Sequence, residues 1–371
     1  MVDKHPFYLN VISDCLGLKY GKFYRWYKEV LSGFRTESVQ RDLHIHDFES
    51  VLPNSKGEKQ TISVPILKPE HIGSHMTIDE KHINQEFYTV LSNGQTGKVA
   101  LMVASMNPQE VGKCLIKFGD KLQTVSTLSR DLSPTYQAIA TTHFKKAKQV
   151  ADKYHIIAEA LESVQDVRVR LRQEALSNQR KEEQAAKLAL QAYRKKEKEG
   201  TLEATEKAPQ KYSPQKVEPG AAHAETLAEL LARSRYLLFK KPTQWNSSQT
   251  RRAELLFRHF PELKQAHQAV NLFRNWYEPN GIKDATWNYL TAETALLDWI
   301  YSAETCGIDE ILNLTKTIEK NQEVILNYHL NYKTNAMAES VNAKIENAIR
   351  LNKGARDKDF FHFRLNMILT R

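Results

Sequence analysis

Three acidic residues lie where predicted strands and helices would bring their side chains to one place. Asp79 ends a predicted strand at 76–79, Asp131 closes a strand predicted at 123–128, and Glu339 lies on a late predicted helix. Clustered carboxylates repel one another unless a cation is present, and Mg²⁺ prefers oxygen ligands. Two such ions roughly 3.5–4 Å apart can activate a water or a 3′-hydroxyl for phosphodiester displacement. These residue types therefore favour metal-dependent phosphoryl transfer.

The helix that carries Glu339 is amphipathic. Thr334 and Asn335 are good N-cap residues, and helix formers follow them without Gly or Pro until Gly354. Glu339 and Asn342 share one face with Glu346, which is an alternative candidate for the third acid. A second face is apolar and suited to a core: Met337, Val341, Ile345 and Ala348.

Each acid also has an ordinary structural interpretation. Asp131 is a good cap for the helix that Ser133-Pro134 opens, and Glu339 would equally suit a solvated helix face. An acid at a strand end commonly caps a turn. The three acids together are more specific than any one of them.

The elements between the acids predict an α/β core. Strands are expected at 76–79, 86–91, 98–104, 123–128 and 148–152, and helices at 107–122 and 133–144. With the helix after the last strand, the order βββαβαβα is that of a ribonuclease H-like sheet. In such a sheet the first and fourth strands are neighbours, so Asp79 and Asp131 would lie side by side.

Four segments follow from these patterns. Residues 1–69 are expected to form a helical hairpin and a connector with one strand at 61–67, and residues 70–160 the first part of the catalytic core. Residues 161–332 are predicted to form a helical insertion, with a Pro-rich disordered loop at about 200–223. Residues 333–371 are helical and would complete the core.

The N-terminal hairpin is basic and aromatic. Its second helix follows a break at Gly17, which is typical of a helix-turn-helix but equally of an ordinary helical hairpin. Four basic side chains are candidates for contacts with DNA phosphates: Lys19, Lys22, Arg25 and Lys28.

Composition limits the class of protein. The 371 residues hold 53 Lys and Arg against 44 Asp and Glu, a net charge of +9 that suits a polyanionic partner. The three cysteines, Cys15, Cys114 and Cys306, are far apart, which argues against a zinc ribbon or a disulfide framework. The chain shows neither a signal peptide nor an apolar run of about 20 residues. We expect a cytoplasmic protein that is not associated with a membrane.

Four motif blocks resemble those of bacterial insertion-sequence transposases of the Asp-Asp-Glu (DDE) type, specifically the ISL-three group. In chain order they are Ile78-Asp79-Glu80, Ser129-Arg130-Asp131-Leu132-Ser133-Pro134-Thr135-Tyr136, Ala151-Asp152-Lys153-Tyr154-His155-Ile156-Ile157 and Thr334-Asn335-Ala336-Met337-Ala338-Glu339-Ser340-Val341-Asn342.

The resemblance implies Mg²⁺-dependent cutting and joining of double-stranded DNA at element ends and target, with Mn²⁺ as a substitute metal. It maps the acidic triad onto Asp79, Asp131 and Glu339, with Asp152, His155 and Asn342 in supporting positions. The resemblance also implies a homo-oligomer on the DNA and association with the bacterial nucleoid.

Two departures accompany the resemblance. The cysteine zinc ribbon of many relatives is absent, and Ser340 replaces the usual Gly after the third acid. A separately encoded N-terminal protein is therefore an expected partner. A structure-specific nuclease that does not join strands and a DNA-binding protein derived from a transposase are the alternative functions.

Overall fold

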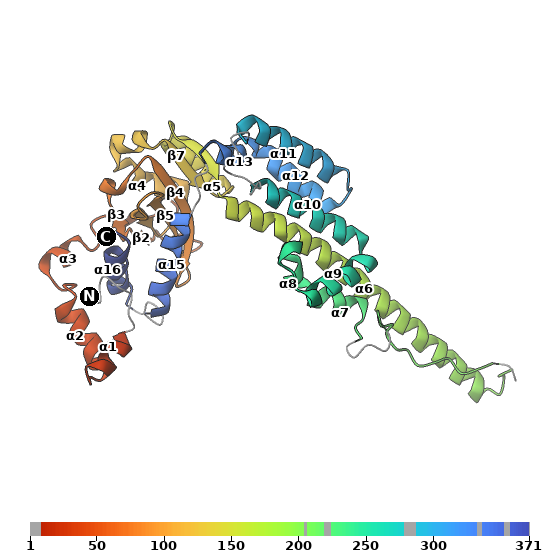
Figure 1. The fold of residues 1–371 in the computed structure, drawn as a ribbon. Coiled ribbons are helices and arrows are strands. Elements are labelled where there is room, and N and C mark those ends of the chain that lie inside the picture. The colour runs from red at the N-terminus through yellow and green to blue at the C-terminus, as the bar shows by residue number, and fades with distance from the viewer. Residues whose placement is uncertain are drawn as a thin grey trace. The chain divides into compact units, whose positions relative to one another are not determined.

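The computed structural model describes residues 9–203, 206–218, 224–277, 287–331, 336–351 and 357–370 (Figure 1). The chain divides into two compact units. The first comprises Met1–Ile156 with Asn321–Arg371, and the second comprises Ile157–Lys320. The predicted helix start at Thr334 and Asn335 lies outside the described residues.

A mixed six-stranded sheet forms the centre of the first unit, in the order β3-β6-β5-β4-β7-β8. Strand β4 is antiparallel to β5 and parallel to β7, and β7 is parallel to β8. The strands of this sheet are β3 (Ile66–Leu67), β4 (His75–Ile83), β5 (Glu86–Asn93), β6 (Val99–Val103), β7 (Thr127–Arg130) and β8 (Lys148–Ala151). A separate two-stranded sheet pairs β1 (Phe48–Glu49) with β2 (Thr61–Ile62). The predicted α/β class with a large helical part is confirmed.

Several predicted element ends were wrong. The single strand expected at 61–67 is split into β2 and β3, because Pro65 lies between them and cannot donate to a strand ladder. Asp79 does not end its strand: β4 continues to Ile83, since residues 79–83 pair with β5. The predicted helix at 107–122 ends earlier, as α4 (Pro108–Ile116), and a 3₁₀ helix begins at Gly119, whose φ of +57° is left-handed.

Different helices pack on the two faces of the sheet. On one face, Met76, Ile78 and Leu128 share a core with residues of α4 and α5 (Pro134–His143). On the other face, Val90 and Met102 share a core with Val341 and Ile345 of α15 (Ala336–Leu351) and with residues of α16 (Lys358–Leu369). Asp79 is paired with Val90 across the β4–β5 ladder, so it belongs to the face that α15 covers.

Three short helices and a π-helical turn precede the sheet: α1 (Leu9–Cys15), α2 (Tyr20–Trp26), η1 (Tyr27–Leu31) and α3 (Glu37–Asp42). The turn at Gly17, with φ of +65°, separates α1 from α2 as predicted, whereas α3 was not anticipated. Leu9, Phe23, Tyr27 and Phe34 form a small core with Phe360 of α16. The N-terminal helices are therefore packed onto the last helix of the chain.

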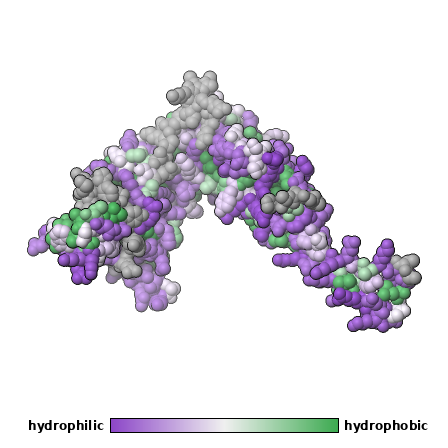
Figure 2. Space-filling model, turned by 60° about the horizontal axis from the view of Figure 1, so that its bottom comes forward, coloured by the Kyte–Doolittle hydropathy of each residue, from purple (hydrophilic) through white to green (hydrophobic). Residues whose placement is uncertain are grey.

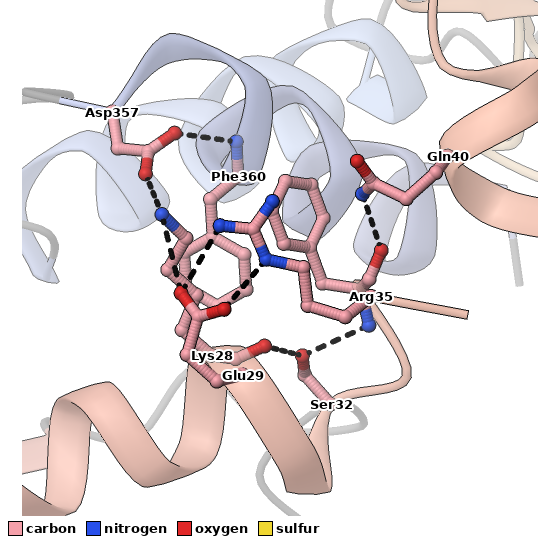
Figure 3. A network of polar contacts seen from close by, with 8 residues as sticks. Lys28, Glu29, Ser32, Arg35, Gln40, Asp357 and Phe360 are labelled. Atoms are coloured by element: carbon pink, nitrogen blue, oxygen red, sulfur yellow. Dashed lines mark hydrogen bonds and ion pairs between the residues drawn. The ribbon is translucent and has the colours of Figure 1, made fainter. Parts of the chain in front are cut away.

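A polar network accompanies this packing (Figure 3). Asp357, the N-cap of α16, accepts the Phe360 N–H at 3.0 Å and pairs with Lys28 of η1. Arg35 donates to Glu29 at 2.6 Å, and Gln40 Nε2 donates to the Phe34 carbonyl at 2.6 Å. Burial raises the pKa of Asp357, but Lys28 and the Phe360 N–H outweigh that effect and the pKa is lowered.

The second unit is helical. Most of α6 (Lys153–Lys198) belongs to it. The described residues of this unit form the further α-helices α7 (Leu227–Arg233), α8 (Arg235–Leu238), α9 (Ser247–His259), α10 (Pro261–Tyr277), α11 (Tyr289–Glu304) and α12 (Asp309–Lys320), with a 3₁₀ helix, η4 (Pro242–Gln244), between α8 and α9. Arg170 of α6 donates to Glu310 of α12 at 2.8 Å and also pairs with Glu262 of α10. Back in the first unit, α13 (Gln322–Leu326) and α14 (Tyr328–Asn331) follow. Residues 206–218, within the predicted disordered loop, have no helix or strand, but Tyr212 donates to Glu182 of α6 at 3.3 Å.

The surface shown in Figure 2 is mostly hydrophilic, with hydrophobic side chains in small groups. None of the helices in the described part of the chain is long and apolar enough to cross a membrane.

Burial of His362 predicts a loss of stability in acid. Burial lowers the pKa of His362 from 6.5 to about 4, so the unfolded chain takes up a proton below pH 6.5 that the folded chain does not. The free energy of unfolding should fall as the pH drops through that window, by about 2 kcal/mol at pH 5 for this residue. Urea titrations at pH 7.5 and pH 5 test this: the loss should shrink in His362→Gln. An equal loss in the variant and the wild type would assign the acid sensitivity to other groups.

Asp357 should stabilise the first unit in two separable ways. Asp357→Asn removes the charge that pairs with Lys28 but keeps an N-cap, whereas Asp357→Ala removes both. We expect Asp357→Ala to lower the free energy of unfolding by about 1 kcal/mol more than Asp357→Asn. Equal losses would show that the cap contributes nothing, and an unchanged Asp357→Asn variant would show that the ion pair contributes nothing.

Candidate active site

Three aspartates lie in one row across the parallel strands. The β4–β7 ladder pairs Thr77 with Ser129, and two residues further along each strand are Asp79 and Asp131. The β7–β8 ladder ends with Arg130 opposite Ala151, so the next residues are Asp131 and Asp152. The Asp152 N–H donates to the Arg130 carbonyl at 2.7 Å, which continues this ladder by one bond. The predicted neighbourhood of Asp79 and Asp131 thus agrees with the strand pairing, and Asp152 extends the row.

Both oxygens of Asp79 are contacted by other parts of the chain. Oδ2 accepts a hydrogen bond from Asn342 Nδ2 of α15 at 2.7 Å, and Oδ1 accepts the Glu80 N–H at 2.8 Å. His155 Nε2, near the start of α6, lies 3.8 Å from Asp79 Oδ1 and 3.8 Å from Asp152 Oδ2. Two of the supporting residues predicted from the sequence, Asn342 and His155, therefore lie beside Asp79, and the third, Asp152, lies beside His155.

Asp131 is held at the end of β7. Its Oδ1 accepts the Ser133 N–H at 2.9 Å, and its carbonyl accepts Arg130 Nη1 at 2.7 Å. Ser133 itself caps α5 by accepting the Tyr136 N–H at 3.3 Å. The interpretation of Asp131 as the cap of this helix was wrong, because Ser133 is the N-cap of α5. Asp131 stabilises the turn before the helix with one oxygen, and its side chain is half-buried.

Glu80 is a further acid beside this row, and it is not among the site residues predicted from the sequence. Burial raises the pKa of its carboxyl, and the charges of Asp131 and Asp79 raise it further. Burial is the larger cause of this raised pKa, and the two aspartates add to it because a like charge disfavours ionisation of a neighbouring carboxyl. The available signal was the adjacent pair Asp79-Glu80 after a strand pattern.

The third predicted acid is on α15. Glu339 lies within this helix, but its side chain is outside the described part of the structure. Asn342 is three residues later on the same helical face and donates to Asp79. Glu346, the alternative, is exposed and accepts a hydrogen bond from Lys81 at 2.5 Å.

The carboxylates of this row are hard oxygen donors of the kind that Mg²⁺ and Mn²⁺ bind. Among the side chains that the structure describes, which exclude that of Glu339, no three His, Cys, Asp or Glu residues are grouped closely enough to hold a metal ion.

The four basic residues proposed for DNA contacts have different environments. Lys19, Lys22 and Arg25 are exposed on and beside α2. Lys28 is only 16% exposed, is paired with Asp357 and lies 5.6 Å from the centre of the Phe34 ring. Three of the four are thus open to a phosphate backbone, and Lys28 contributes to the packing of the N-terminal helices.

Comparison with known families identifies the chain. A transposase family model, that of the ISL3 group of DDE transposases, matches residues 76–365, which is most of the chain. No curated protein matches it. The matched region begins in β4, three residues before Asp79, and ends within α16, so it includes every acid discussed above. The chain therefore belongs to the ISL3 family of DDE transposases.

Proposed function

We propose that this protein is a DNA transposase that binds the ends of its insertion sequence and cuts and joins DNA strands with Asp79, Asp131 and Glu339. The observation that supports this most is the row of carboxylates across β4 and β7, in a chain of a transposase family. Metal-dependent phosphoryl transfer needs acidic side chains that converge on one point. Asp79 and Asp131 come from adjacent parallel strands and meet that need.

We further propose that the core is ribonuclease H-like. The central strand order β6-β5-β4-β7-β8, with α4 before β7 and α5 before β8, supports this assignment. In such a sheet the acids lie where open α/β sheets place their sites, near the carboxyl ends of the parallel strands. The edge strand β3 is an addition to that pattern.

Asp79 and Asp131 fit Mg²⁺, with Mn²⁺ as a substitute, because their carboxylate oxygens are hard ligands on adjacent strands. When bound, the metal would stabilise negative charge on the reacting phosphate and its leaving oxygen. Asp79 and Asp131 would hold it through their carboxylates, and Glu339 would complete the set from α15. Asn342, on the same helical face as Glu339, already contacts Asp79, which favours Glu339 over the Lys81-bound Glu346.

The triad predicts loss of chemistry without loss of DNA binding. Asp79→Asn, Asp131→Asn and Glu339→Gln should each reduce strand cleavage to background, because each removes a negative charge that the metal requires. Binding to end-containing duplex, measured by fluorescence anisotropy, should stay near the wild-type value. Glu346→Gln, on the same face of α15, is the matched control and should cleave normally.

Two results would change the proposal. Full cleavage by any of the three variants would remove that residue from the site. Cleavage by the wild type without strand transfer to a target duplex would make the protein a nuclease that does not join strands, and binding without cleavage would leave only a DNA-binding role.

DNA binding through α2 predicts a change in salt dependence. Replacing Lys19, Lys22 and Arg25 with Ala should weaken binding and make the slope of log K against log salt shallower by up to roughly 2.7, because each lost phosphate contact contributes about 0.9. The matched control removes three exposed lysines elsewhere in the same unit, Lys56, Lys59 and Lys121. If the α2 variant and the control have the same slope as the wild type, α2 does not contact DNA.

A further inference from the structure

Asp79 is contacted on both of its carboxylate oxygens by side chains from distant parts of the chain. Asn342 Nδ2 donates to Oδ2 at 2.7 Å from α15, and His155 Nε2 lies 3.8 Å from Oδ1 at the start of α6. The side chain of Asp79 is 19% exposed, so little water is available to replace these contacts. Two elements that meet only in the folded chain thus converge on one acid.

His155 is in turn associated with Asp152. The imidazole Nε2 lies 3.8 Å from Asp152 Oδ2, while Asp152 Oδ1 accepts the Tyr154 N–H at 2.9 Å. The Asp152 N–H is also bonded to the Arg130 carbonyl at 2.7 Å, so the residue is fixed to the end of β7. Two hydrogen bonds to the backbone therefore hold Asp152 in place, and the exposed imidazole of His155 lies next to its carboxylate.

Helix formation explains only part of this arrangement. Asp152 has a structural role, because its carboxylate satisfies an N–H in the first turn of α6. Asn342 and His155 have no such role in the contacts described here: each directs a polar side chain from a helix to a strand carboxylate. Partners of this kind orient metal-binding groups, and their removal typically costs 10–100-fold in metal affinity or activity.

We propose that Asn342 and His155, with Asp152 behind His155, are positioning residues that fix the orientation of the Asp79 carboxylate for metal binding. This inference rests on the proposed function. The Asn342 hydrogen bond also joins α15 to β4, beside the apolar contacts that Val341 and Ile345 make with the sheet. It therefore couples the orientation of Asp79 to the placement of Glu339, one helical turn earlier.

The experiment measures metal binding without catalysis. Free Mn²⁺ is followed by electron paramagnetic resonance during titration of the full chain and of Asn342→Ala and His155→Ala. Asn347→Ala on α15 and His82→Ala on β4 are the matched controls. We expect the two positioning variants to bind Mn²⁺ about 10–100-fold more weakly than the wild type, and the controls to bind as the wild type does.

A second measurement separates positioning from catalysis. The Mg²⁺ concentration for half-maximal cleavage should rise by the same factor, about 10–100-fold, and saturating Mg²⁺ should restore most of the rate. Asp152→Asn keeps an N-cap residue for α6 and should show a smaller increase than His155→Ala. If circular dichroism shows that Asn342→Ala is unfolded, Asn342→Ser is used in its place. His155→Asn replaces His155→Ala under the same condition.

The outcomes distinguish this inference from the proposed function. If the wild type binds Mn²⁺ in a manner that Asp79→Asn abolishes, but the positioning variants bind it equally well, only this inference is overturned. If the wild type shows no Mn²⁺ binding that depends on Asp79, the proposed metal site is overturned, and this inference with it.

Discussion

The parallel pairing of β7 with both of its neighbours is the constraint on which the site depends. Backbone hydrogen bonds fix the register of β4, β7 and β8, and that register places Asp79, Asp131 and Asp152 in one row. Like charges at such spacing repel one another, so side-chain attraction cannot be what assembles them. The buried Arg130 helps to hold the strand ends together, since it donates to Gln149 of β8 at 2.8 Å.

The late helix α15 joins this row through an ordinary amphipathic pattern. Val341 and Ile345 are buried against the sheet with Val90 and Met102, while Asn342, one residue after Val341, is turned to Asp79. Apolar burial therefore positions the helix, and the polar residue beside the apolar stripe completes the site. Because this face of the sheet is the one that carries Asp79, the core and the proposed site depend on the same packing.

Much of this site could be predicted from the sequence, because the positions of the strands and of two aspartates follow from local residue patterns. Runs of apolar residues indicated the strands, and the acids next to two of these runs identified Asp79 and Asp131, although Asp79 lies within β4 and not at its end. Other features depend on tertiary pairing, which local patterns do not contain: the extension of β4 to Ile83 through β5, and the position of Asp152 in the row. The pairing of Lys28 with Asp357 joins residues at opposite ends of the chain, so the composition of α2 and η1 could not reveal it.

The central claim is that this row of carboxylates is a metal site, and anomalous X-ray diffraction from crystals grown with Mn²⁺ tests it most directly. The account predicts a manganese peak within about 2–2.5 Å of carboxylate oxygens of Asp79 and Asp131, with Glu339 as a further ligand. A peak that contacts neither aspartate, or ordered carboxylates with no peak at saturating Mn²⁺, would contradict it.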